Sequence, residues 1–201
     1  MIWSVSVDLD GLGCYAAIHG LSLRLDERAQ RAVPEVALQR FCELFQGLGV
    51  RATFFAIGRE AAIAPASLKA AALAMYALRG RGSQSILGGI GQLFGPRQAH
   101  RRRGVREVPV ATLPLLRAPV IGTTILAFPW LAQRAFAGGH LNLELHGIDA
   151  LDASDVPSEI AEAQPGLRMP AAHKLRRLRG VLEALPGGHC TLYEAAIRLL
   201  P

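Results

Sequence analysis

Lysine is almost absent from this chain of 201 residues. Of its 22 basic residues only Lys69 and Lys174 are lysines, so arginine carries nearly all of the positive charge behind the net charge of +6. Such an arginine bias is as typical of genome composition as of a binding surface. Cysteine is scarce too: Cys14, Cys42 and Cys190 are far apart and include no Cys-x-x-Cys pair. An odd number of scattered cysteines excludes a secreted disulfide framework and indicates a reducing compartment.

Long apolar runs are also lacking. The longest uncharged apolar stretch, Ala118–Gln133, contains Pro119 and Pro129 and is shorter than the roughly 20 residues that cross a bilayer. No basic segment precedes an apolar run at the N-terminus, so we expect no signal peptide. With 51% hydrophobic and 19% charged residues, the composition is globular rather than disordered. We therefore expect one soluble, cytoplasmic domain over residues 1–201.

The first segment, Ile2–Gly11, predicts a buried strand that ends in two carboxylates and a glycine. Asp8 and Asp10 are two positions apart, so both leave a regular strand on the same side. The C-terminal ends of strands in α/β folds are where ligands and catalytic groups collect. Adjacent like charges are costly unless a cation or a shared proton relieves them, so the pair predicts a metal ion or a raised carboxyl pKa. The alternative is that Asp-Gly merely opens a turn.

A second titratable strand end is predicted late in the chain. Val33–Leu48 has a helical period and Val50–Ile57 is rich in aromatic and β-branched residues, so with the first strand they predict a βαβ unit of two adjacent parallel strands. Leu141–Leu145 predicts a further strand that ends in His146-Gly147-Ile148-Asp149. We therefore expect the candidate catalytic and metal-binding residues at the ends of these two strands.

The remaining segments predict alternating elements. Helices are expected over Pro65–Leu78, Leu131–Ala137, Pro170–Leu185 and Tyr193–Leu200, and short strands over Arg106–Ala111, Val120–Phe128 and His189–Leu192. Loops are expected over Arg79–Gly104 and Asp152–Gly166, and Leu12–Arg31 is expected to be a mixed loop with room for a short helix over the site. The helix Pro170–Leu185 has a basic face of Lys174, Arg176, Arg177 and Arg179. That face lacks interleaved aromatic residues, so we interpret it as solvated rather than as a nucleic-acid surface.

Three stretches together resemble polysaccharide deacetylases of the NodB-homology type: Ser-Val-Asp-Leu-Asp-Gly at 6–11, the phrase from Gly49 to Gly58, and Asn142–Asp149. The resemblance implies an α/β fold, a distorted (β/α) barrel that removes N-acetyl groups from a saccharide with zinc or another divalent metal. It implies that Asp8 is the general base, Asp10 the carboxylate metal ligand and His146 the general acid toward the leaving amine. Such a set is chemically coherent for amide hydrolysis.

The chain departs from the family pattern near residues 60–65. The His-x-x-x-His pair that completes the family's metal site is missing, as is its Arg-x-Pro-aromatic motif, and no histidine lies between His19 and His100. The chain therefore resembles a deacetylase with an internal deletion and an incomplete barrel. A catalytic zinc normally has three protein ligands, of which Asp10 would supply one. We interpret His19, His100 and His140 as hydrogen-bonded or solvent-facing side chains, because their spacings match no ligand pair.

Other functions stay open. The missing histidines favour a non-catalytic remnant that keeps a saccharide groove. Val-Asp-Leu-Asp-Gly also resembles the nucleophile strand of haloacid-dehalogenase-type phosphatases, with Lys69 or Lys174 on phosphate and Asp149 with Asp152 on magnesium. That reading requires a threonine where Leu12 stands and leaves residues 49–58 unexplained, so it ranks lower. Nucleic-acid binding through residues 79–106 rests on charge alone, and we expect no such partner.

Loss of strands exposes parallel sheet edges and apolar surface, so we expect low stability or self-association. Thermal unfolding followed at several protein concentrations, together with light scattering, tests this. Self-association predicts an unfolding midpoint that rises with concentration. A sharp, concentration-independent transition of a monomer contradicts it.

Overall fold

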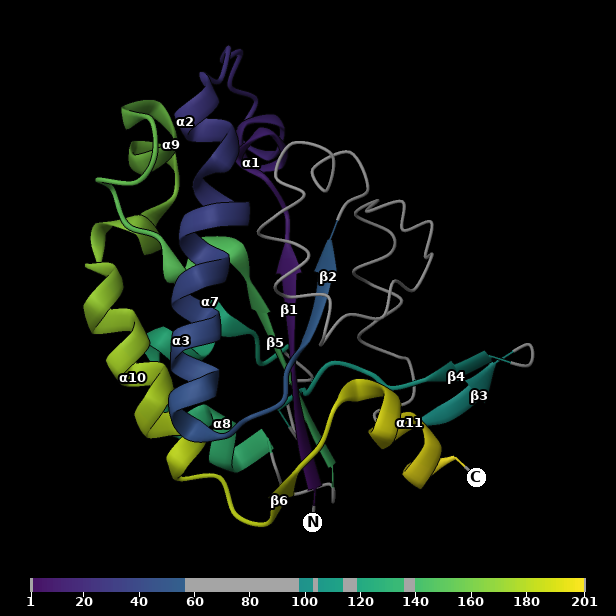
Figure 1. The fold of residues 1–201 in the computed structure, drawn as a ribbon. Coiled ribbons are helices and arrows are strands. Elements are labelled where there is room, and N and C mark those ends of the chain that lie inside the picture. The colour runs from purple at the N-terminus through teal and green to yellow at the C-terminus, as the bar shows by residue number, and fades with distance from the viewer. Residues whose placement is uncertain (1, 57–97, 103–104, 114–118, 136–139, 201) are drawn as a thin grey trace.

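A computed structural model of the chain describes residues 2–56, 98–102, 105–113, 119–135 and 140–200. This part is a mixed α/β structure in which a small parallel sheet has most of its helices to one side (Figure 1). The expected α/β class is confirmed, while closure of the sheet into a barrel stays a prediction. The predicted helix Pro65–Leu78 and most of the predicted loop Arg79–Gly104 lie outside the described residues.

The sheet is built around β1 (Ile2–Leu9). Strand β5 (His140–His146) runs parallel to it along one edge, and β2 (Thr53–Ala56) runs parallel along the other. The short β6 (Gly188–His189) pairs with the start of β1. The predicted βαβ unit is therefore confirmed, and the register places Asp8 beside His146.

The other elements connect these strands. A separate antiparallel pair consists of β3 (His100–Arg102) and β4 (Val105–Glu107). The helices and helical turns are α1 (Leu12–Ile18), α2 (Glu27–Arg31), the π-helical η1 (Ala32–Ala37), α3 (Leu38–Leu48), α7 (Gly122–Ala127), α8 (Trp130–Ala135), the 3-10 turn η4 (Gly147–Ala150), α9 (Ser158–Ala163), the 3-10 turn η5 (Pro165–Arg168), α10 (Ala171–Glu183) and α11 (Leu192–Leu199). Among the described helices, none has the length and apolar character that crossing a bilayer requires.

The two faces of the β1–β5 pair differ in polarity. Odd-numbered side chains such as Val5, Val7, Leu143 and Leu145 are fully buried in the hydrophobic core. Even-numbered positions carry the polar residues Ser4, Ser6, Asp8, His140, Asn142, Glu144 and His146. Because side chains alternate along a strand and paired positions share a face, the register gathers these polar groups on one side of the sheet.

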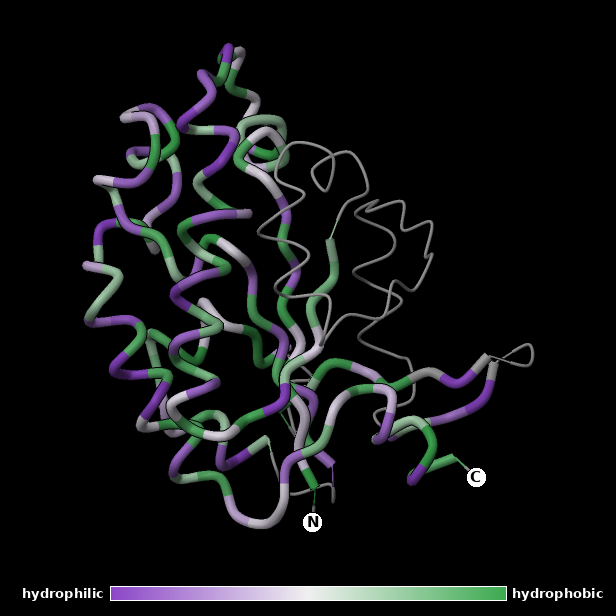
Figure 2. Tube along the Cα trace, in the orientation of Figure 1, coloured by the Kyte–Doolittle hydropathy of each residue, from purple (hydrophilic) through white to green (hydrophobic). Residues whose placement is uncertain are grey.

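The predicted helix Val33–Leu48 forms, but its first turns are π-helical. Pro34 lies within η1 and has no backbone N–H to donate, so a regular ladder is interrupted there. The α-helical part ends at Gly49, whose φ of 63° is the left-handed cap that glycine favours. Phe41 and Phe45 stack on its buried face at 5.7 Å between ring centroids. Figure 2 shows hydrophobic and hydrophilic residues alternating along the helices beside the sheet, as in amphipathic helices.

The predicted strand Val120–Phe128 is wrong. Only Ile121 pairs with Glu144 of β5, and the chain then turns into α7. Apolar runs this short do not distinguish helix from strand by periodicity, and a helical turn buries both Ile125 and Leu126.

Other predicted boundaries also shift. The short helix expected within Leu12–Arg31 is α1, and α2 follows it in the same segment. The expected acidic loop Asp152–Gly166 contains helix α9.

Close packing at the end of β5 makes Gly147 a test of the fold. A Cβ placed there would lie 2.4 Å from Cγ1 of Val33, whose side chain is 0% exposed. We expect Gly147→Ala to lower the free energy of unfolding by roughly 1–3 kcal/mol through overpacking. Gly180 of α10 is the matched control, because a Cβ there meets nothing within 4 Å and alanine favours helix by about 0.5–1 kcal/mol. Urea unfolding followed by circular dichroism measures the stability of Gly147→Ala and Gly180→Ala. Equal unfolding midpoints for the two variants would contradict the close packing of Gly147 against Val33.

Candidate functional site

Three side chains converge at the C-terminal end of β1 and β5. Asp8, Glu144 and His146 each offer a possible metal-ligand atom, and these atoms lie within 4.8 Å of one another. The strand register explains the convergence, since Asp8 is paired with His146 and Glu144 precedes it by two residues on the same face. All three side chains are half-buried. The structure thus brings together two of the three predicted site residues, Asp8 and His146.

The carboxyl groups of Asp8 and Glu144 interact directly. A hydrogen bond joins them, and the pKa of Glu144 rises to about 7, first through burial and then through the negative charge of Asp8. Burial also raises the pKa of Asp8, while the charge of His146 opposes that rise. The pair therefore shares a proton near neutral pH. A raised carboxyl pKa was expected from the sequence, but the partner of Asp8 is Glu144 on another strand.

Asp10 is not part of this group of three. Its negative charge still contributes to the raised pKa values of Asp8 and Glu144, so it belongs to the same end of the sheet. Tyr15 of α1 is close by: burial raises the pKa of its hydroxyl, and the charges of Asp149, Asp10 and Asp8 raise it further. Within the described part of the chain that buried hydroxyl has no hydrogen-bond partner. An unpaired buried donor beside carboxylates fits a site that a bound group completes.

His19, His100 and His140 are each hydrogen-bonded, as predicted, with His100 Nδ1 3.1 Å from the carbonyl oxygen of Gln98. His19 Nε2 lies 2.9 Å from Oε1 of Gln164, and His140 Nε2 lies 3.2 Å from Oγ of Ser4. Burial lowers the pKa of His140 to about 4, so its ring is neutral at physiological pH. None of these three histidines belongs to the group at the strand ends.

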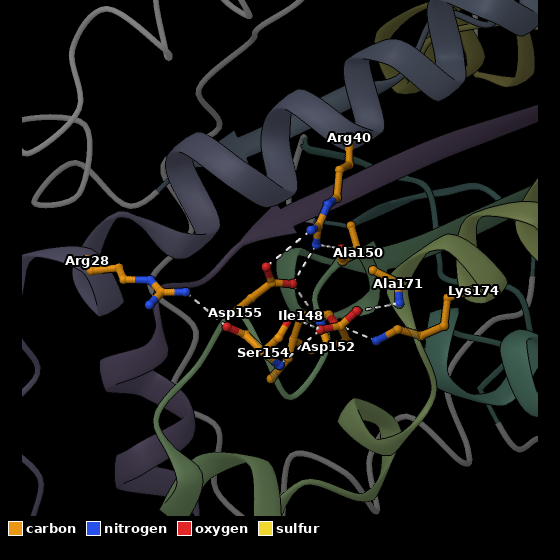
Figure 3. A network of polar contacts seen from close by, with 9 residues as sticks. All are labelled: Arg28, Arg40, Ile148, Ala150, Asp152, Ser154, Asp155, Ala171 and Lys174. Carbon is orange, nitrogen blue, oxygen red and sulfur yellow. Dashed lines mark hydrogen bonds and ion pairs between the residues drawn. The ribbon is translucent and has the colours of Figure 1, made fainter.

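Asp152 and Lys174, which a phosphatase would use for magnesium and phosphate, are hydrogen-bonded to the protein itself (Figure 3). Asp152 accepts hydrogen bonds from the N–H of Ala171 at 2.8 Å and from the N–H of Ser154 at 3.0 Å. Lys174 donates to the carbonyl of Ile148 at 3.2 Å. The side chain of Lys174 is 3% exposed, so its assignment to a solvated basic face is wrong. Lys174 and Leu178 are both buried residues of α10, and their spacing of four positions places them on the same face of the helix. Lys69, the other candidate, lies outside the described residues.

Sequence reasoning did not single out Glu144 or Tyr15. The signal for Glu144 was present, because it precedes His146 by two positions on a predicted strand and therefore shares its face. Tyr15 had no comparable signal, since its burial depends on how α1 packs. Comparisons of the chain with protein-family models, curated proteins and solved structures each found no match.

The raised pKa of Glu144 predicts a pH-dependent stability. The folded pKa of about 7 lies above the ordinary glutamate pKa of 4.5. The folded state therefore binds more protons than the unfolded chain between these pH values and loses stability as the pH rises through them. In metal-free protein, Glu144→Gln should remove this loss and be more stable than the parent at pH 8 by on the order of 2 kcal/mol.

Urea unfolding between pH 4 and pH 8 measures the effect, with the exposed Glu159→Gln as the matched control. Parallel stability curves for the parent and Glu144→Gln would show that no proton is held at this site.

Proposed function

We propose that the chain is a divalent-metal-dependent hydrolase that removes N-acetyl groups from an amino sugar or polysaccharide. The observation that supports this most directly is the convergence of Asp8, Glu144 and His146 within 4.8 Å. Three protein ligands with an open position are the usual number at a catalytic zinc. Glu144 and His146 would thus supply ligands in a chain whose sequence lacks the His-x-x-x-His pair.

The donor set fits such an ion. Two carboxylates and one imidazole suit zinc, manganese or another first-row divalent metal. A dication would replace the proton shared by Asp8 and Glu144 and remove their mutual repulsion. When bound, the metal supplies polarisation of the amide carbonyl and a lowered pKa for water.

The grouping leads us to exchange the roles of the two aspartates relative to the resemblance. Asp8, rather than Asp10, lies with Glu144 and His146, so we assign Asp8 and His146 to the metal. Asp10 is half-buried at the end of the same strand and would take a proton from water and return it to the leaving amine. The acetylated saccharide would then approach from the C-terminal end of β1.

Metal binding separates these roles. Titration calorimetry on chelator-stripped protein should show one zinc or manganese ion bound. Asp8→Asn and Glu144→Gln should each lower the metal affinity by more than about 10–100-fold, the loss typical when a residue that only contacts a metal ligand is changed. Asp10→Asn and the control Glu159→Gln should keep affinities close to the parent's. If Asp10→Asn loses the metal while Asp8→Asn keeps it, the roles implied by the resemblance hold instead.

Catalysis is tested by acetate release from N-acetylglucosamine oligomers. We expect release that a chelator abolishes, and Asp10→Asn should lower kcat by about 10²–10⁴-fold, the usual contribution of a general acid or base, while the metal remains bound. Metal-loaded protein that binds the oligomers but releases no acetate contradicts the hydrolase and favours a saccharide-binding module.

A further inference from the structure

The 3-10 turn η4 (Gly147–Ala150) follows His146 directly and shares two hydrogen bonds with it. The side chain of His146 accepts the backbone N–H of Asp149, and the carboxylate of Asp149 accepts the backbone N–H of His146 at 2.9 Å. The pairing of β5 with β1 fixes the backbone of His146 beside Asp8. The direction of the His146 side chain therefore depends on where η4 lies.

Two cationic side chains from different helices hold η4 by its carbonyl groups (Figure 3). Lys174 of α10 donates from Nζ to the carbonyl of Ile148 at 3.2 Å, and Arg40 of α3 donates from Nη1 to the carbonyl of Ala150 at 2.8 Å. The last carbonyls of a helical turn have no partner within it, and basic side chains are suited to bind them. The turn is thus bound to α3 and α10 at once.

Arg40 is itself fixed by a carboxylate. Its Nη1 and Nη2 donate to the two oxygens of Asp155, at 2.5 Å and 3.1 Å. Oδ2 of Asp155 also accepts the backbone N–H of Asp152 at 2.9 Å, and Asp152 accepts the N–H of Ala171 at the start of α10 at 2.8 Å. A bidentate pair of guanidinium and carboxylate fixes direction as well as distance. One polar network therefore joins η4, α3 and α10 (Figure 3).

Burying a cation is an energetically unfavourable way to hold a turn. The side chain of Lys174 is buried, and burial lowers its pKa against the opposing charges of three nearby aspartates. A charged group loses its hydration on burial, and hydrophobic residues of similar volume often give equal or greater stability in such places. What the cations supply beyond packing is direction, because each hydrogen bond fixes one carbonyl group. This favours a role in the geometry of the site over a role in stability alone.

We propose that Arg40 and Lys174 are positioning residues for the candidate site. By holding the carbonyls of η4 from two helices, they keep the His146 side chain directed at Asp8 and Glu144. The hold on η4 depends on no bound group. Its consequence for a metal rests on the proposed function.

Amide hydrogen exchange of the metal-free chain measures how firmly η4 is held. In the parent, the amides of His146 and Leu151, both hydrogen-bonded at this turn, should exchange as slowly as the slowest amides of the β1–β5 pair. Lys174→Met keeps the aliphatic stem and removes the ammonium group. It should speed exchange of these two amides by about tenfold or more and leave the sheet amides less affected. Arg40→Met should do the same, and provides a second variant if Lys174→Met fails to fold.

Arg28→Met is the matched control, because the exposed Arg28 binds the carbonyl of Ser154 in the same network, at 3.1 Å, rather than a carbonyl of η4. It should leave both amides unchanged. Amides of η4 that exchange far faster than those of the sheet in the parent overturn the proposal, and this measurement needs no variant. Amides that Lys174→Met and Arg40→Met both leave unchanged overturn it as well.

Zinc affinity tests whether the hold on η4 serves the site. At a temperature at which circular dichroism shows each variant folded, calorimetry should give affinities about 10–100-fold lower in Lys174→Met and Arg40→Met than in the parent. Arg28→Met should match the parent. A purely stabilising role would leave the affinity of the folded protein unchanged, so equal affinities overturn the proposal. Absence of zinc binding in the parent defeats the proposed function, and the exchange rates then decide whether Arg40 and Lys174 position η4.

Discussion

The parallel pairing of β1 with β5 determines what this chain can do. It places Asp8 beside His146 and brings Glu144 to the same face. A slip of one residue would turn these side chains to the opposite face of the sheet. The register is fixed by the other face, where Val5, Val7, Leu143 and Leu145 are fully buried. Because burying each of these side chains contributes about 1.5–3 kcal/mol, the apolar core enforces the arrangement of the polar site.

The site works against the stability of the fold that holds it. Asp8 and Glu144 are partly desolvated like charges, and burial raises the pKa of both. Protonation of one carboxyl group relieves this repulsion near neutral pH, and a divalent ion bound between the two groups would relieve it at higher pH, so a proton and a metal would compete for the same position. Behind them Asp149 is buried with bound oxygens. Functional sites commonly hold ionisable groups with perturbed pKa values in an unfavourable arrangement that the surrounding packed structure maintains.

Local sequence patterns predicted the fold better than the site. The strands β1, β2 and β5 and helices α3 and α10 follow from clear periodicity, and Asp8 and His146 from their places at strand ends. Local patterns do not predict which side chains from distant segments of the chain come into contact. The spacing of Asp8 and Asp10 predicts that these two carboxylates interact with each other. The carboxyl group that is hydrogen-bonded to Asp8 is instead that of Glu144, far along the chain. The helical pattern predicts Lys174 on a solvated face, and that prediction is wrong because the hydrogen bond of Lys174 to the carbonyl of Ile148 depends on tertiary packing.

The most direct measurement is anomalous diffraction at the zinc edge from crystals of the chain soaked in zinc, with Glu144→Gln crystals treated in the same way. An ion held by this site should give one strong peak between Asp8, Glu144 and His146, with bonds of about 2.0–2.2 Å, and the peak should weaken or disappear in Glu144→Gln. A peak elsewhere, or equal occupancy in the variant, would contradict the role of the β1–β5 pairing in building a metal centre.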